Sequence, residues 1–138
     1  MTGCFELRDH TADVAVAARG PTLDAVFAST ADGLTAAMCD DCPPGGDRFE
    51  LVVRESSLET LLFSYLDELI YQRDVRGVLP CDHDAVVTKT ADEWGVAATA
   101  RGLSLDAVAA RDVKAVTYSQ LSVTRTDDDW ETYVVFDV

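Results

Sequence analysis

The sequence is poor in positive charge. Two of its 138 residues are lysines, Lys89 and Lys114, and 11 basic residues stand against 25 acidic ones, which gives a formal net charge of -14. Binding of DNA or RNA through its phosphates depends on clustered lysine and arginine side chains. We therefore expect no direct binding of nucleic acid, so any role in nucleic-acid biology runs through a partner protein.

Long apolar runs and secretion signals are missing as well. No stretch approaches the roughly 20 apolar residues that a membrane-spanning helix needs. The first residues, Met1 to Glu6, lack the basic region and apolar core of a signal peptide. We expect a cytoplasmic protein with no membrane contact. The 48% apolar content and the length predict one folded domain over residues 1–138.

The acidic residues have an unusual balance. Aspartate outnumbers glutamate by 18 to 7. A surface rich in hydrated carboxylates is typical of proteins from salt-accumulating halophiles. At molar salt the Debye length falls to about 3 Å, so the self-repulsion of a strongly acidic chain is largely screened. The composition therefore predicts an acidic, halophilic protein.

Two helices and several strands are predicted from the spacing of apolar residues. Thr22 can cap a first helix that ends near Cys39, and Ser56 with Glu59 forms a capping box for a second. The second helix has an apolar stripe at helical spacing, made of Leu58, Leu61, Leu62, Tyr65, Leu66, Leu69 and Ile70. Strands are expected near 5–8, 14–18, 49–54, 78–81, 85–90, 94–101, 114–124 and 130–138. The expected fold class is α+β, with two main helices on a mixed or antiparallel sheet.

The chain carries no recognisable catalytic motif. A nucleophile-elbow serine, a Walker loop and a glycine-rich dinucleotide fingerprint are all missing from the sequence. Only His10 and His83 could serve histidine-based acid–base catalysis. We therefore expect a protein that acts on a partner, with no catalytic residue of its own.

A cation site is a candidate at the two ends of the chain. Asp13 precedes a predicted strand, Asp137 is the penultimate residue, and Val138 adds a terminal carboxylate. If the first and last strands are close together, these oxygens could bind a hard cation such as Ca²⁺, which takes six to eight oxygen ligands. In so acidic a chain, the alternative is that these carboxylates only hold water at the surface.

The cysteines leave two further interpretations open. Cys39 and Cys42 have the spacing of half a zinc site or of a redox pair, and Cys81 with His83 could supply a second half. The run Pro43 to Gly46 places the first pair in a loop, which favours free thiols in a turn.

Five blocks of the sequence resemble segments of the archease family, and they occur in the same order as in that family. They are Asp9–Val14, Arg19–Leu23, Leu58–Tyr71, Val113–Tyr118 and Val134–Val138. The blocks reach from one end of the chain to the other. Ser119 departs from the family pattern, because a histidine is common at that position.

The resemblance implies both a function and a set of site residues. Archeases activate the RtcB-type RNA ligase, which joins tRNA halves after intron removal; they promote guanylylation of the ligase and its multiple turnover, and relax its choice of nucleotide. The resemblance implies calcium ligands at Asp13, Asp137 and Val138. It also implies activation of the ligase through Asp13, Lys114 and His10, and contact with tRNA only through the ligase.

Two functions from other classes remain as alternatives. The acidic cluster could belong to a small metal-dependent hydrolase or nucleotide-binding enzyme. Alternatively, the cysteines and His83 could form a zinc-bearing, chaperone-like module.

Overall fold

The chain folds into seven strands and two long helices. A computed structural model describes residues 3–9 and 13–138. In chain order the elements are β1 (Cys4–Asp9), β2 (Asp13–Gly20), α1 (Leu23–Met38), β3 (Asp47–Glu55), α2 (Leu58–Arg76), β4 (Val78–Lys89), β5 (Trp94–Ser104), a short 3₁₀ turn (Leu105–Ala107), β6 (Ala115–Arg125) and β7 (Trp130–Asp137).

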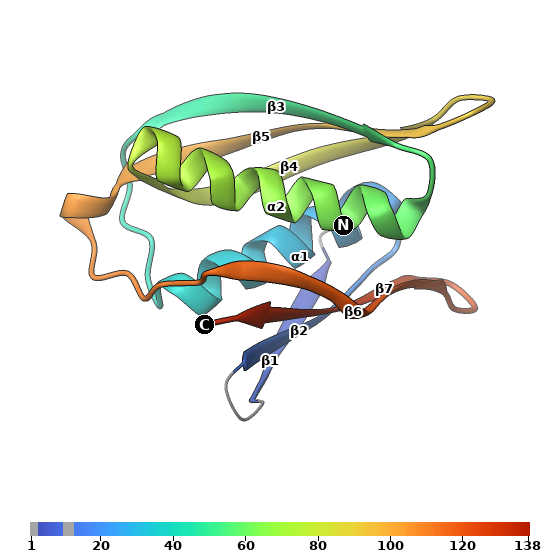
Figure 1. The fold of residues 1–138 in the computed structure, drawn as a ribbon, viewed down its shortest axis with the longest axis horizontal. Helices are drawn as coiled ribbons and strands as arrows, with labels where there is room; N and C mark the ends of the chain where they lie inside the picture. Colours follow the sequence, from blue (N-terminus) through green and yellow to red (C-terminus); the bar gives the residue numbers. More distant parts are fainter. Residues whose placement is uncertain (1–2, 10–12) are drawn as a thin grey trace.

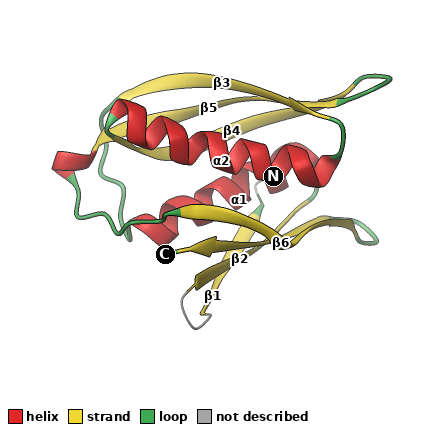
Figure 2. Cartoon of the chain, viewed as in Figure 1, coloured by secondary structure: helices red, strands yellow, loops and turns green. Residues whose placement is uncertain are grey.

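The strands form two sheets with the helices between them. One sheet has the order β1-β2-β7-β6 and the other β3-β5-β4. Every strand pair in the described part of the chain is antiparallel. Figures 1 and 2 show α1 and α2 as a middle layer, and each helix contacts strands of both sheets. The expected α+β class with two main helices is thus confirmed, and the sheets are antiparallel rather than mixed.

The helix boundaries follow from local capping. The Thr22 hydroxyl accepts a hydrogen bond from the Ala25 N–H at 3.1 Å, which caps α1 as expected. The cap of α2 was predicted one residue too early. Ser57, not Ser56, accepts from the Thr60 N–H, at 3.2 Å. Gly77 ends α2 in the left-handed region with φ 66°, where a residue without Cβ has no steric penalty.

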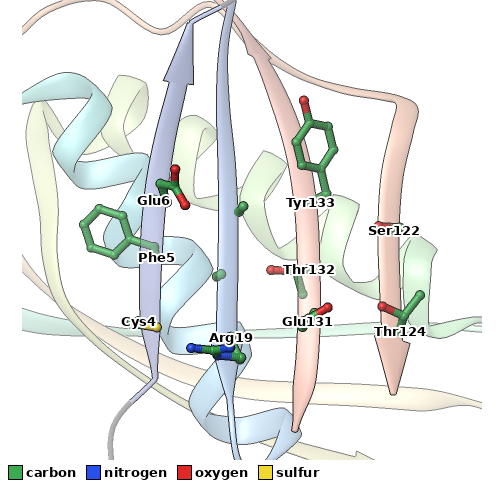
Figure 3. Close-up of a pocket in the computed structure, with 11 residues that line it drawn as sticks. Cys4, Phe5, Glu6, Arg19, Ser122, Thr124, Glu131, Thr132 and Tyr133 are labelled. Atoms are coloured by element: carbon green, nitrogen blue, oxygen red, sulfur yellow. The ribbon is translucent and has the colours of Figure 1, made fainter. Parts of the chain in front are cut away.

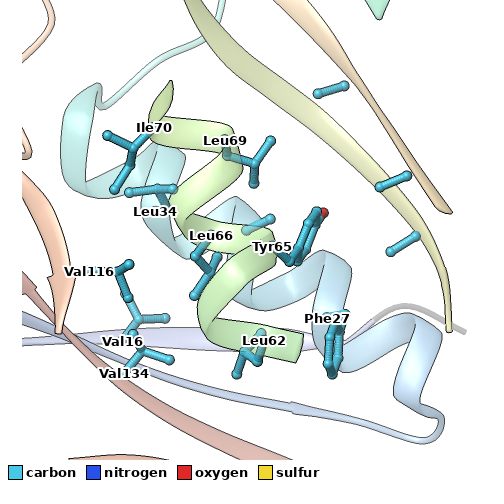
Figure 4. Packing of buried hydrophobic residues seen from close by; sticks show 14 of the residues in the cluster. Val16, Phe27, Leu34, Leu62, Tyr65, Leu66, Leu69, Ile70, Val116 and Val134 are labelled. Atoms are coloured by element: carbon cyan, nitrogen blue, oxygen red, sulfur yellow. The ribbon is translucent and has the colours of Figure 1, made fainter. Parts of the chain in front are cut away.

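The core lies in the helical layer and on the two sheet faces that enclose it. Figure 4 shows Tyr65, Leu66 and Leu69 of α2 close to α1, with Val16 and Val134 of the four-stranded sheet on one side. All seven residues of the predicted α2 stripe are buried. The stripe is therefore a core feature, as its helical spacing indicates.

One strand differs from its predicted form. The stretches predicted as separate strands near 78–81 and 85–90 are a single strand, β4, with a register shift between Cys81 and Asp84. Asp82 lies in this irregularity with φ 50°. An inserted residue of this kind interrupts the period of two that identifies a strand, which is why the pattern appeared broken.

The order of strands in the larger sheet brings the two ends of the chain together. Strands β2 and β7 are hydrogen-bonded neighbours in the middle of this sheet. Because they are antiparallel, the start of β2 lies beside the end of β7.

Candidate functional site

Asp13 and Asp137 lie directly opposite each other on β2 and β7. Opposed residues of an antiparallel pair point to the same face of the sheet, with Cβ atoms about 4.5–5.5 Å apart. Asp13 is half-buried and Asp137 is exposed. The two carboxylates, from positions near the two ends of the chain, therefore share one solvent-accessible end of the central β2–β7 strand pair, termed the carboxylate edge.

Lys114 lies at the same end of the strands, immediately before β6, which is the other neighbour of β7. Its backbone N–H donates a hydrogen bond of 2.8 Å to the carbonyl oxygen of Asp137. The next residue, Ala115, is the strand partner of Asp137. Lys114 is exposed, and so is Val138 at the end of β7. The fold thus gathers Asp13, Lys114, Asp137 and Val138 in one place, whereas His10 lies outside the described residues.

A buried arginine holds the segment that leads to Lys114. The Arg73 guanidinium, on the inner face of α2, donates to the carbonyl oxygen of Val113 at 2.8 Å. It also forms ion pairs with Asp74 at 3.0 Å and Asp112 at 3.5 Å. The backbone immediately before Lys114 is therefore anchored to the core helix.

A second arginine ties the same segment to the end of α1. The backbone N–H of Arg111 donates to the Met38 carbonyl at 2.6 Å. Its side chain donates to the carbonyl oxygens of Ala37 at 3.1 Å and Ala36 at 3.0 Å. Carbonyls in the last turn of a helix have no partner within the helix, so Arg111 satisfies three groups that would otherwise face water.

Sequence reasoning missed both arginines. For Arg73 a signal existed, because position 73 continues the helical spacing of the apolar stripe after Leu69 and Ile70. A charged residue at an inward position of a core helix indicates a buried partner. For Arg111 there was no such signal, since its partners, backbone carbonyls of α1 and the Asp40 carboxylate, are more than 70 positions away in the sequence.

The donor chemistry of the edge suits a hard cation. Two opposed carboxylates repel each other, and a cation between them relieves that repulsion. Calcium accepts a mixture of carboxylate and backbone oxygens with irregular geometry. Among residues 3–9 and 13–138, no three His, Cys, Asp or Glu side chains gather as a metal-binding group. A cation at this edge would therefore depend on Asp13, Asp137 and further oxygens such as the Val138 carboxylate.

The four residues of the zinc alternative do not converge. Cys42 and Cys81 are in contact, but the Cys39 thiol donates to the Asp41 carbonyl at 3.1 Å. His83 turns into the core, where its Nε2 is 2.8 Å from the Thr35 hydroxyl. The zinc-bearing module has no assembled site in the part of the chain that the structure describes.

Two titratable groups whose pKa values are shifted by burial, Asp32 and His83, lie between α1 and β4. Burial raises the pKa of Asp32 to about 6, against a hydrogen bond from the His83 backbone N–H that lowers it. Burial lowers the pKa of His83 to about 4. Desolvation disfavours the charged form of each group, so Asp32 takes up its proton at a higher pH, and His83 at a lower pH, than when exposed to water. Within the described part of the chain, neither side chain shares a hydrogen bond or ion pair with Asp13, Asp137 or Lys114, so the two groups have a structural role.

A hollow of about 400 Å³ lies on the solvent face of the four-stranded sheet. Figure 3 shows Glu6, Arg19, Thr124 and Tyr133 around it. Arg19 is near the end of β2, whereas Asp13 is its first residue. The hollow is therefore separate from the carboxylate edge.

Known proteins share both the sequence pattern and the fold of this chain. A family model for the archease protein family (MTH1598/TM1083) matches residues 5–138. The chain belongs to the archease family. The resemblance carried by the five sequence blocks is thereby confirmed.

Individual archeases agree with this assignment along nearly the whole chain. The protein archease of Methanosarcina barkeri is 32% identical, over 97% of this chain and 95% of its own length. The protein archease of Thermococcus gammatolerans is 34% identical, over 90% of each chain.

Two solved structures share the fold. The solution structure of Methanobacterium thermoautotrophicum protein 1598 superposes with a TM-score of 0.86, at 25% identity, over 97% of this chain and 98% of its own. A crystal structure of an archease and possible chaperone from Thermotoga maritima gives a TM-score of 0.62 at 20% identity, covering 96% of each chain. The second likeness bears on the fold alone. Neither α1 nor α2 of this archease-family chain has the length and apolar character needed to cross a membrane.

Proposed function

We propose that this chain activates an RtcB-type tRNA-splicing RNA ligase, promoting guanylylation of the ligase and multiple turnover. The observation that carries the proposal is that Asp13, Asp137 and Lys114 lie together at the carboxylate edge in a chain of the archease family. Three positions from separate parts of the sequence thus contribute to one charged surface. The chain acts on a partner enzyme and contacts tRNA only through it, in the cytoplasm.

In this proposal each residue has a separate role. Asp13, Asp137 and the Val138 carboxylate hold a calcium ion, and Lys114 with His10 contacts the ligase. The calcium ion, when bound, supplies positive charge beside the carboxylates. The Lys114 ammonium group offers a point charge suited to phosphate oxygens. Because Arg73 and Arg111 fix the backbone before Lys114, little backbone entropy is lost when this segment binds the ligase.

A reconstituted assay tests the proposal. Purified ligase, GTP and an RNA with cleaved ends are incubated with and without the full chain, and ligated RNA and guanylylated ligase are measured over time. We expect more ligated product per ligase molecule and faster guanylylation in the presence of the chain. Since the protein carries a net charge of -14, the assay runs from dilute to molar salt. No stimulation at any salt concentration would rule the proposal out.

The same preparation addresses the alternative of a small metal-dependent hydrolase or nucleotide-binding enzyme. The isolated chain is incubated with nucleoside triphosphates and phosphoesters in the presence of calcium or magnesium. Turnover that is abolished by Asp13→Asn would favour the enzyme. Ligase stimulation without such turnover favours the activator.

A further inference from the structure

Two cysteine thiols from distant parts of the sequence touch inside the fold. The Cys81 thiol donates a hydrogen bond to the Cys42 sulfur, with 3.0 Å between the two Sγ atoms. Cys42 lies in the connection between α1 and β3, and Cys81 lies on β4. Cys81 is buried and Cys42 is half-buried, so this pair has one protected and one accessible sulfur.

Arg101 of β5 holds both cysteine segments in place. Its guanidinium donates to the carbonyl oxygens of Pro43 at 2.8 Å and Gly45 at 2.7 Å, next to Cys42. The same guanidinium donates to the Asp82 carboxylate at 2.6 Å, next to Cys81. Nη2 of Arg101 contacts the same carboxylate oxygen at 2.6 Å, and the Arg101 side chain is largely buried. The approach of the two sulfurs is thus fixed by groups other than the sulfurs themselves.

The other two cysteines are poor partners for this pair. Cys39 has the C-x-x-C spacing to Cys42, but its thiol donates to the Asp41 carbonyl at 3.1 Å. Cys4 is exposed on β1, in the other sheet. The C-x-x-C spacing offered Cys39 as a partner for Cys42, although free thiols were the favoured interpretation; in the fold, the sulfur in contact with Cys42 is that of Cys81.

We propose that Cys42 and Cys81 are a disulfide-forming modification site, oxidised by a low-molecular-weight disulfide and reopened by a dithiol reductant. A disulfide requires the sulfurs to approach to about 2.05 Å, a movement of about 1 Å from their present contact. Cys42 lies in a loop, so this movement needs no change in the sheet. The inference does not depend on the proposed function.

The chemistry proceeds by two thiol–disulfide exchanges. The thiolate of Cys42, the more accessible sulfur, attacks one sulfur of the oxidant. The S–S bond of the oxidant breaks, and one thiolate leaves and takes up the proton that Cys42 had released. Cys42 is then part of a mixed disulfide. Cys81 then attacks the Cys42 sulfur, a second thiol leaves, and the Cys81 proton passes to that leaving thiolate. In total the protein loses two hydrogen atoms and the oxidant is reduced to two thiols. Burial and then the hydrogen bond to Cys42 raise the pKa of the Cys81 thiol, which makes Cys81 the second sulfur to react.

The bond would staple the loop before β3 to β4. It closes a loop between positions 39 apart in the sequence, which restricts the unfolded chain more than the folded one. We expect the melting temperature of the oxidised protein to exceed that of the reduced protein by about 5–15 °C. Asp13 and Asp137 belong to the other sheet, so the staple leaves the carboxylate edge unchanged.

The test uses the full chain and oxidised glutathione as the probe. After incubation in native buffer, free thiols are counted, intact mass is measured and the linked peptides are sequenced by mass spectrometry. The measurement is made on Cys4→Ser, because the exposed Cys4 thiol would itself take up glutathione. We expect a decrease from three free thiols to one, a mass loss of two hydrogen atoms and a peptide pair containing Cys42 and Cys81. Dithiothreitol should reverse all three changes and lower the melting temperature.

Matched variants separate this site from the alternatives. Cys39→Ser and Cys4→Ser should form the same disulfide as the parent chain. Cys42→Ser, which changes a half-buried loop residue, should lose the disulfide and keep the fold. A link between Cys39 and Cys42, a glutathione adduct that stays on Cys42, or an unchanged number of free thiols would each overturn the proposal.

Discussion

Asp13 and Asp137 oppose each other as register partners on β2 and β7, so carboxylates from near the two ends of the chain meet across one strand pair. Like charges directly opposite in a sheet are destabilising. The arrangement is therefore costly unless a cation or a partner's positive charge lies between them. The pairing of Asp13 with Asp137 should therefore make the free energy of unfolding depend on calcium.

Replacing one of the two carboxylates should separate repulsion from calcium binding. Without calcium, we expect Asp137→Asn to raise the free energy of unfolding by about 0.2–1 kcal/mol, because the repulsion with Asp13 is removed. With calcium, the parent chain should gain about 2.7 kcal/mol at a concentration 100 times the dissociation constant, and the variant should gain much less. Urea unfolding in dilute salt, with calcium or a chelator, measures both quantities.

The control for this experiment is Asp92→Asn, at the exposed turn between β4 and β5. It changes net charge by the same amount but lies in the other sheet. Its response to calcium should match that of the parent chain. Equal calcium stabilisation of the parent and Asp137→Asn would contradict a site at this edge.

The two lysines form a matched pair for testing the contact with the ligase. Lys114→Met should abolish ligase stimulation, because it removes the ammonium group of a residue whose backbone pairs with Asp137, while keeping a long side chain. Lys89→Met should stimulate like the parent chain, since Lys89 stacks on Trp94 in the other sheet. Both exposed changes should alter the free energy of unfolding by less than about 0.5 kcal/mol. Equal stimulation by both variants would remove Lys114 from the proposal.

Arg73 should control how firmly the segment before Lys114 is held. Arg73→Met removes a buried charge and leaves the Val113 carbonyl without its donor, so we expect a loss of about 1–3 kcal/mol in unfolding free energy. The amide protons of Arg111 and Lys114 should exchange faster with solvent. Hydrogen exchange followed by mass spectrometry detects this change.

Arg76 of the same helix provides the comparison. It is exposed, and its guanidinium stacks on Phe49 at 4.7 Å from the ring centroid. Arg76→Met should cost less than about 1 kcal/mol and leave exchange at residues 111–114 unchanged. Faster exchange there in Arg76→Met, or none in Arg73→Met, would show that Arg73 is not the anchor.

Asp32 and His83 should have opposite effects on stability below neutral pH. Burial lowers the pKa of His83 to about 4 in the folded chain, from 6.5, so its contribution to stability rises as the pH increases between these values. Burial raises the pKa of Asp32 to about 6, from 3.8, so its contribution falls as the pH increases over that range. The two effects largely offset each other in the native protein.

Substituting one of the two residues should reveal the pH dependence of stability that the other causes. In Asp32→Asn, the free energy of unfolding should rise between about pH 4 and pH 6.5 more steeply than in the parent chain, because only the His83 effect remains. In His83→Gln, the free energy of unfolding should instead fall as the pH increases over this range, because only the Asp32 effect remains. Urea unfolding at several pH values within this range measures the slopes, and an Asp32→Asn profile flatter than that of the parent chain would contradict the assignment.

Local sequence determined the helices and most of the strands. The stripe from Leu58 to Ile70 specifies one face of α2, since apolar residues at helical spacing can be buried only by packing that face on something else. Thr22 and the left-handed Gly77 fix where helices start or stop through contacts within a few residues. Either of two adjacent serines could cap α2. Sequence spacing predicts Ser56, whereas in the folded backbone the capping hydroxyl belongs to Ser57.

The meeting of distant residues was decided only by the tertiary structure. The sequence showed that Asp13 and Asp137 were candidates, but their distance depends on β2 and β7 being neighbours in the sheet, which no local pattern specifies. The same holds for Cys42, which has the C-x-x-C spacing to Cys39 but contacts Cys81 in the fold. Composition and periodicity report which face of an element is buried; which elements bury one another is set by how the whole chain closes its core.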